Sequence, residues 1–179
     1  MESYRNRLLA ATPTLSDSNF ALGVILVLEH DPDGAFGIVL NRPSTMPLPE
    51  SLAGWTEHAS LPAVLFVGGP VQPDVVLLVG HAEGPGRDPS GPAPLPPGLT
   101  LADPDTPPEL STVRDVRAFA GYAGWGPGQL DREVSSGGWF VVDLEEGDVL
   151  TPAPETLWKR VLRRQGGLLT TITPDPTGN

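Results

Sequence analysis

Four polar side chains of the sequence stand where apolar runs end, and their chemistry suits a small anion. His30, Asn41 and Arg42 follow two β-branched runs, and His81 follows a third. A guanidinium and an amide bind anionic oxygens, and an imidazole can transfer a proton near neutral pH. The set would act together only if the strand ends that carry it meet. Otherwise each residue is an ordinary hydrogen-bonded or solvated strand end.

Glycines at two further strand ends supply candidate backbone donors. Gly68 and Gly69 form one such site, and Gly126 and Gly128 form the other. Without side chains, successive N–H groups can approach a ligand closely and form an anion-binding nest. The same pattern is also an ordinary tight turn, so both interpretations stay open. No GK[ST] follows Gly69, so the segment is not a nucleotide-binding P-loop.

The segment from Gly121 to Asp143 predicts a strand, a glycine-rich turn, a short helix, a second turn and a strand. Gly126 can adopt dihedrals that side chains forbid, and Pro127 suits the first position of the helix. Leu130 and Val134 lie four residues apart, which gives the helix an apolar stripe to pack on a sheet.

Two interpretations of this segment compete. In one it is a structural corner, where glycines let a strand turn tightly into a helix. In the other it is a ligand pocket with a floor of backbone N–H groups and walls formed by Tyr122 and Trp125. Gln129 would then lie near the positive end of the helix dipole.

Several kinds of catalytic chemistry find no support in the sequence. There is no cysteine, which excludes disulfides, thiolate catalysis and cysteine-based metal sites. The three histidines form no HxxxH or HxH pair, and no GxSxG elbow, SxxK pair or paired-carboxylate spacing occurs. We therefore assign no catalytic residue, no metal ligand and no cofactor.

The charge balance opposes binding to nucleic acids. The chain carries 22 acidic and 11 basic residues, a formal net charge of −11. Nucleic-acid binding needs a basic face that displaces counterions. The one local concentration of positive charge is Lys159, Arg160, Arg163 and Arg164. These cations suit the negative C-terminal end of a helix, so direct nucleic-acid binding is not expected.

The chain reads as one domain over residues 1–179. No signal-peptide core precedes Pro13, and nowhere do eighteen apolar residues run together, which predicts a cytoplasmic protein without a membrane span. The 21 glycines and 22 prolines are clustered. A surface loop is expected at about 82–98, and a frayed tail after Thr173.

Outside the segment from Gly121 to Asp143, the apolar runs predict six strands and two helices. The runs Leu22–Glu29 and Ala35–Leu40 flank Asp33-Gly34, which predicts a hairpin. Both runs are apolar on both faces, so this hairpin should be central in its sheet. Trp55 is expected in the core, and the acidic residues between 143 and 148 in a solvated turn. The other elements are strands at Leu8–Ala11, Val64–Val67, Val75–Val79 and Leu99–Leu101, and helical turns at Pro49–Trp55 and Pro154–Gln165.

Three sequence strings resemble the bacterial YqgE/AlgH family. They are GAFGIVLNRP (Gly34–Pro43), FVGGPV (Phe66–Val71) and GYAGWGPGQLDREV (Gly121–Val134), in the order of the family. The resemblance spans nearly the whole chain. It implies an α+β domain with a bifurcated, barrel-like, mostly antiparallel β-sheet flanked by a few α-helices. The family is labelled in part as transcriptional regulators, and no agreed catalytic residues come with it.

Three functional hypotheses follow. The first is a non-enzymatic binding or regulatory module for a small ligand or a protein partner. The second is an enzyme for a small anionic substrate, with His30, Asn41, Arg42 and His81 around the glycine turns. The third is a regulator that acts directly on DNA, which the acidic charge disfavours. The sequence favours the first.

Overall fold

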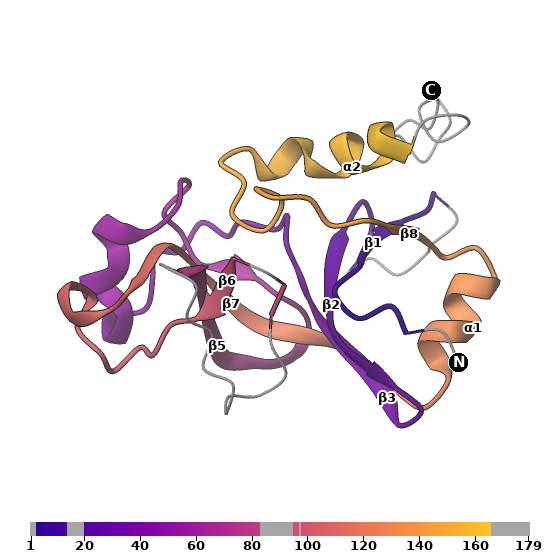
Figure 1. Cartoon of the computed structure of the whole chain (residues 1–179), viewed down its shortest axis with the longest axis horizontal. Coiled ribbons are helices and arrows are strands. Elements are labelled where there is room, and N and C mark those ends of the chain that lie inside the picture. The colour runs from indigo at the N-terminus through magenta and orange to yellow at the C-terminus, as the bar shows by residue number, and fades with distance from the viewer. Residues whose placement is uncertain (1–2, 14–19, 83–94, 97, 166–179) are drawn as a thin grey trace.

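The fold is built on one mostly antiparallel sheet of eight strands (Figure 1). The computed structural model describes residues 3–13, 20–82, 95–96 and 98–165. Most of the loop predicted at 82–98 and the tail after Thr173 lie outside these residues. The strands are β1 (Leu8–Ala11), β2 (Val24–Asp31), β3 (Gly34–Val39), β4 (Phe66–Val67), β5 (Val71–Ala82), β6 (Leu99–Leu101), β7 (Val113–Trp125) and β8 (Trp139–Val142).

The strand order confirms the expected α+β fold and shows that the sheet is open. The order is β6-β5-β7-β3-β2-β1-β8, and β4 pairs with β7 in parallel. β6 and β8 are the two ends of this path, so the sheet does not close into a barrel. β2 and β3 form the predicted antiparallel hairpin, and they lie in the middle of the order. Their central position is therefore confirmed.

The sheet divides along β7, whose two parts pair with different strands. Residues up to 122 pair with β5, and two of them also pair with β4, whereas residues 123–125 pair with β3. Gly121 has a φ of 75°, a left-handed conformation that glycine adopts without strain. A side chain at this position would also clash with the backbone oxygen of Gly69. β7 passes from one half of the sheet to the other at this glycine.

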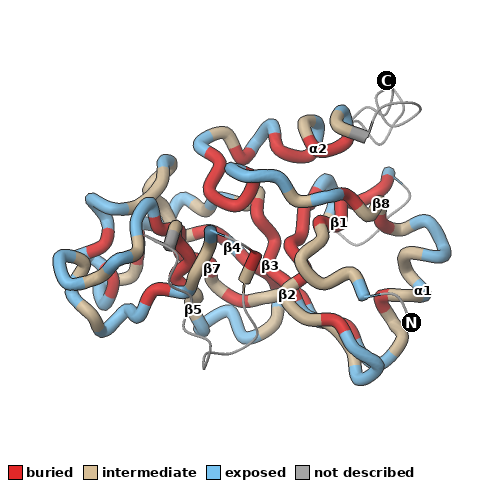
Figure 2. The backbone as a smooth tube through the Cα atoms, viewed as in Figure 1, coloured by how far each residue is buried: buried red, intermediate tan, exposed pale blue. Residues whose placement is uncertain are grey.

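β1 and β2 are apolar on both faces because both of their faces are covered. Leu8 and Leu26 point into one hydrophobic cluster, whereas Leu9 and Ile25 point into another on the opposite face. Successive side chains of a strand alternate between faces, so an uninterrupted apolar run needs a layer on each side. Figure 2 shows this as continuous burial along β1 and the first half of β2.

Helices on different sides of the sheet cover three hydrophobic clusters. α2 (Leu157–Gln165) packs on the first, α1 (Gln129–Ser135) on the second, and the 3₁₀ helix η1 (Glu50–His58) on the third. Two short 3₁₀ helices, η2 (Pro108–Leu110) and η3 (Pro154–Thr156), complete the described elements. The apolar residues Leu157, Trp158, Val161 and Leu162 of α2 are buried, and Trp55 is 2% exposed in the third cluster. The prediction that Trp55 lies in the core is confirmed.

Some predicted boundaries differ from the structure. β5 begins at Val71 rather than Val75, because Val71 already pairs with β7. β4 has only two residues. α1 begins at Gln129, and its N-cap Gly128 has a φ of 70°. The prediction that Pro127 takes the first helical position is therefore wrong, and the left-handed glycine that precedes the helix is Gly128.

The acidic segment before α2 is not simply a solvated turn. Asp148 is 2% exposed and accepts two hydrogen bonds from the Arg164 guanidinium, at 2.8 and 3.0 Å. Glu145 forms a second ion pair with Arg164 at 2.9 Å. The hydrogen bond to Asp148 raises the pKa of Arg164, and burial acts against it. This cation therefore fixes α2 to the loop that follows β8, beyond any role at the end of the helix dipole.

Candidate functional site

The glycine-rich segment carries a hydrogen-bond network centred on the carboxylate of Glu133. Its Oε1 accepts from the indole N–H groups of Trp125 (3.2 Å) and Trp139 (3.0 Å), and its Oε2 accepts from Gln129 Nε2 at 2.8 Å. Gln129 Oε1 in turn accepts the N–H of Gly126 at 3.0 Å. This Glu133 network ties α1 to the end of β7 and the start of β8. The geometry agrees with the interpretation of the segment as a structural corner.

Tyr122 and Trp125 do not wall one pocket. Tyr122 packs against the first hydrophobic cluster, whereas Trp125 is a member of the second. The two residues are three apart on one strand, and side chains separated by an odd number of residues point to opposite faces. The predicted pocket between the two rings is therefore not formed.

The Gly68-Gly69 pair lies where the chain crosses closely over β7. The Gly68 N–H donates to Ala120 O at 2.7 Å, and the Gly68 carbonyl accepts from Val39 at 2.8 Å. A Cβ at Gly69 would clash with the backbone of Tyr122. The glycines are needed for this close approach, and the Gly68 donor of the expected anion nest is already engaged.

Asn41 and Arg42 hold the turn that precedes β2. Both ends of the Asn41 amide bond backbone groups at 3.0 Å, the Val24 N–H and the Leu22 carbonyl. Arg42 Nη2 donates to a backbone oxygen of the same turn at 2.7 Å. Asn41 and Arg42 also line a broad surface hollow of about 590 Å³, to which the first turn of α2 contributes Lys159.

His30 holds the N-terminal segment against the sheet. Its Nδ1 accepts the Tyr4 N–H at 2.9 Å, and the two rings stack with centroids 5.2 Å apart. An imidazole nitrogen that accepts carries no proton, so the ring proton of the neutral form is on Nε2. That nitrogen lies 3.4 Å from Asp131 Oδ2 on α1. His30 is 6% exposed, which leaves little of the ring for a ligand.

The four polar residues proposed to act on an anion do not converge. His30 pairs with the start of β3, beside the hairpin turn, whereas Asn41 and Arg42 lie beyond the other end of the hairpin. His81 lies on β5 opposite Arg114, near the start of β7, which is the end of that strand farthest from α1. The structure therefore assembles no single site from this set.

A buried arginine forms a second structural junction. Arg117 is 2% exposed and donates to the backbone oxygens of Leu61 (2.8 Å) and Val149 (3.2 Å). Its guanidinium also lies 4.2 Å from the centroid of the Phe66 ring. Burial lowers the pKa of Arg117 to about 10. The sequence offered one sign of this position, because Arg117 is two residues from Phe119 and so shares its inward face.

An apolar opening lies where the sheet divides. Two adjoining cavities, of about 250 and 280 Å³, share Phe36 and Leu77 as lining residues. We call them together the fork groove. The strands β2, β3, β5 and β6 supply most of its wall, and Tyr122 of β7 closes one end. The principal apolar residues of the fork groove are Leu26, Leu28, Phe36, Ile38, Val75, Leu77, Val79, Leu95, Leu99, Leu101 and Tyr122.

The fork groove is the side of the first hydrophobic cluster that α2 does not cover. Leu28, Leu77 and Leu99 are partly buried residues packed against that cluster, and all three line the groove. At its mouth, Phe36 is 41% exposed and Val75 is 43% exposed. Exposed apolar side chains that cluster around a cavity are typical of a binding surface.

A single carboxylate lies in the wall of the fork groove. Glu29, the residue after Leu28 on β2, lines the first cavity and forms an ion pair with Arg5 at 3.7 Å. The other lining residues of that cavity are apolar. A pocket with mostly apolar walls and few polar groups is the usual form of a small-molecule site.

Within residues 3–13, 20–82, 95–96 and 98–165, no three histidine or acidic side chains are grouped closely enough to hold a metal ion. None of the helices in those ranges combines the length and the apolarity needed to cross a bilayer.

The open, divided sheet defines a class of α+β protein that solved structures also contain. The chain belongs to the AlgH-like family, whose model matches residues 8–170. The resemblance drawn from the three sequence strings is thereby confirmed. The relatives are bacterial, and the function of the family is uncharacterised.

Similar proteins match the chain over most of its length. It is 45% identical to a UPF0301 protein of Streptomyces coelicolor, over 100% of this chain and 97% of the relative. A crystal structure from Corynebacterium diphtheriae has a TM-score of 0.84 at 30% identity, covering 95% of this chain and 91% of that one. The solution structure of the AlgH protein from Pseudomonas aeruginosa has a TM-score of 0.67 at 28% identity, with coverages of 97% and 98%.

Sequence reasoning missed the fork groove and Glu133. The groove is assembled from four strands that are distant in sequence, so no local pattern marks it. For Glu133 a signal existed, because it lies four residues after Gln129 and so faces the same side of the helix. This face of the helix packs against two tryptophans. A carboxylate that is partly buried there needs hydrogen-bond donors, and the two indole N–H groups are the nearby donors.

Proposed function

We propose that this protein is a non-enzymatic binding module that holds a small, largely apolar molecule in the fork groove. One observation carries the proposal. The main hydrophobic cluster is covered by α2 on one side and lies open along the fork groove on another. His30, Asn41 and Gln129 are engaged in holding the fold, and the described residues assemble no catalytic set.

The size and polarity of the groove support a small-molecule ligand. Either cavity exceeds the roughly 150 Å³ of an engineered apolar cavity that binds benzene. Together they fall in the range of about 300–1,000 Å³ that is usual for ligand pockets. Transfer of an alkyl chain or ring from water to such walls is favourable by about 25 cal/mol per Å² of apolar surface buried.

The proposal agrees with the charge of the protein and needs no contact with nucleic acid. A net charge of −11 repels a phosphate backbone. A regulatory role would then come from ligand-dependent contacts with other proteins, rather than from direct binding to DNA.

The test uses 1-octanol as a neutral apolar probe. Calorimetric titration should show binding to the wild-type protein, and the melting temperature should rise with probe concentration. Leu77→Trp should abolish binding, because Leu77 lines both cavities. Leu110→Trp is the matched control, since Leu110 is 74% exposed on η2 and lines neither cavity. No binding to the wild-type protein, or equal binding to Leu77→Trp, would overturn the proposal.

A further inference from the structure

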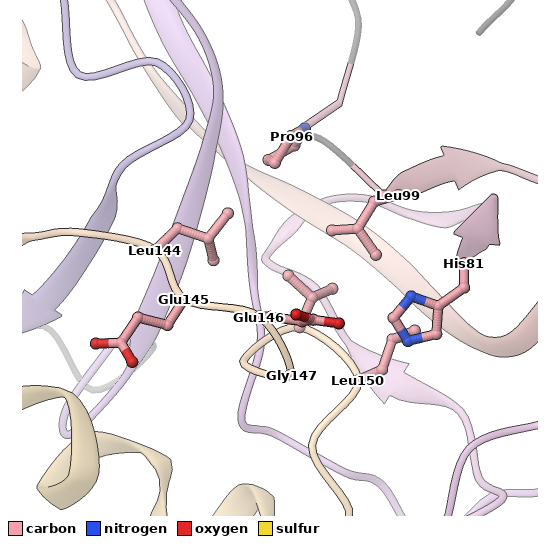
Figure 3. A pocket seen from close by; sticks show the side chains of 10 residues that line it. His81, Pro96, Leu99, Leu144, Glu145, Glu146, Gly147 and Leu150 are labelled. Atoms are coloured by element: carbon pink, nitrogen blue, oxygen red, sulfur yellow. The ribbon is translucent and has the colours of Figure 1, made fainter. Parts of the chain in front are cut away.

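A polar pocket adjoins the fork groove. It has a volume of about 210 Å³, and its lining includes His81, Glu146, Leu99, Leu144 and Leu150 (Figure 3). His81 comes from the end of β5, and Glu146 comes from the loop between β8 and η3. In Figure 3 the imidazole and the carboxylate point toward one another across the pocket, with leucines around them.

The two neighbouring glutamates differ in what they contact. Glu145 forms an ion pair with Arg164 at 2.9 Å, and its carboxylate points away from His81 in Figure 3. Glu146 forms no ion pair or hydrogen bond with any residue that the structure describes, and the same holds for the His81 ring. Both groups accept hydrogen bonds, His81 in its neutral form and Glu146 when ionised. A ligand that donates hydrogen bonds and carries positive charge therefore suits the space between them.

The polar pocket and the fork groove share one wall. Leu99 of β6 lines both of them. Leu99 and Leu144 are also partly buried residues at the edge of the same hydrophobic cluster that the groove exposes. Leu99 therefore presents apolar surface to the polar pocket and to the fork groove, which also contains Leu28 and Leu77.

We infer that the ligand is an amphipath with a cationic amine head. The head lies between His81 and Glu146, and the apolar tail passes Leu99 into the fork groove. This inference rests on the proposed function and adds the chemistry of the head group. The charge of the whole protein acts in the same direction, because a net charge of −11 raises the local concentration of cations and repels anionic amphipaths.

The experiment compares three probes that share one tail, namely octylamine, 1-octanol and octanoate. At pH 7 the amine is protonated and the carboxylate is ionised. Calorimetric titration should rank the affinities in that order, with octylamine about tenfold tighter than 1-octanol. Octanoate should bind weakest, because its charge meets Glu146. Leu77→Trp should abolish the binding of all three.

Glu146→Gln separates the head group from the tail. This variant should weaken octylamine by up to about fivefold, the upper end for an ion pair with an exposed carboxylate. It should leave 1-octanol unchanged. Glu57→Gln is the matched control, because Glu57 is exposed on η1 and the change removes the same charge away from the pocket. If both variants lose the same affinity for octylamine, the net charge of the protein alone attracts the amine, and the inference is overturned.

The other outcomes distinguish the inference from the proposed function. If 1-octanol binds in a way that needs Leu77, and the three probes bind equally, the apolar site stands and the cationic head is wrong. If octylamine binds but Leu77→Trp does not weaken it, the tail does not enter the fork groove and the inference fails. If none of the probes binds to the wild-type protein, the proposed function itself fails.

Discussion

Among individual residues, Glu133 makes the most specific contribution to the fold. One carboxylate accepts the indole N–H groups of two tryptophans and the amide of Gln129. Trp125 and Trp139 are 7% and 3% exposed, so water is a poor substitute for this acceptor. Buried donors that lose their acceptor cost about 1–3 kcal/mol each. The network should therefore stabilise the packing of α1 on the sheet.

Replacement of Glu133 tests this network. Glu133→Leu leaves two indole donors unpaired and should lower the free energy of unfolding by about 2–4 kcal/mol. Glu133→Gln keeps one oxygen for the indoles but opposes its NH₂ to that of Gln129, so about half of that loss is expected. Urea denaturation followed by tryptophan fluorescence measures both. Ser135→Ala, at an exposed position of the same helix, should change the free energy by less than about 0.5 kcal/mol. A stable Glu133→Leu protein would contradict the assignment.

Residue-level roles were the hardest to predict from sequence, because they depend on partners from other elements. The sequence shows Asp148 as one of several acidic residues in a turn. In the structure it accepts a hydrogen bond from Arg164 of α2, sixteen residues later. His30 looked like a group at an open strand end, but the N-terminal segment covers it. In each case the side chain was visible in the sequence, and the group that engages it was not.

At the scale of elements, the passage of β7 between the two halves of the sheet depends on Gly121. The residue combines a φ of 75° with a close approach to the backbone of Gly69. A non-glycine residue in a left-handed conformation costs about 1–3 kcal/mol, and the clash adds to this. Since α1, the Glu133 network and the fork groove all lie beyond or beside this point, their relative placement depends on it.

Two alanine substitutions on β7 test this role. Gly121→Ala should lower the free energy of unfolding by about 3 kcal/mol or more. Gly124→Ala is the matched control three residues later. Its new methyl group would meet nothing closer than 3.8 Å, and its backbone is not left-handed, so a change within about 1 kcal/mol is expected. Thermal and urea unfolding measure both. Equal effects of the two substitutions would show that the conformation of Gly121 is not required.

The types of several elements were predictable because a strand that is buried on both faces has an uninterrupted run of apolar residues. The runs that became β1, β2 and β3 are largely apolar, and β1 and the first half of β2 are buried on both faces. The extents of β5 and β7 were not predictable. Val75 is 43% exposed and Pro73 nearby suggests a loop, but β5 pairs with β7 on both sides of an irregularity between Val71 and Val76. Alternation along β7 would have placed Tyr122 and Trp125 on opposite faces.

At the scale of the whole molecule, β7 joins all three hydrophobic clusters. Val116 and Ala118 belong to the third cluster, Phe119 to the first, and Ala123 and Trp125 to the second. Each of the three clusters also contains a tryptophan, so tryptophan fluorescence follows the unfolding of all three clusters. Trp55 lies in the third cluster, Trp158 in the first, and Trp125 and Trp139 in the second. A strand shared in this way predicts that the described part of the chain unfolds as one unit despite its divided sheet.

A substitution confined to one cluster tests this cooperativity. Leu52 of η1 is 4% exposed in the third cluster, and Leu52→Ala should lower the free energy of unfolding by about 2–5 kcal/mol. If β7 couples the clusters, tryptophan fluorescence and far-ultraviolet circular dichroism will shift together to one lower urea midpoint. Leu110→Ala, at a position 74% exposed on η2, should leave the midpoint in place. A first transition that carries only part of the fluorescence change would mean that the third cluster unfolds alone. The fork groove would then lie between two separately stable halves, and a ligand bound there would stabilise their contact instead of filling a preformed pocket.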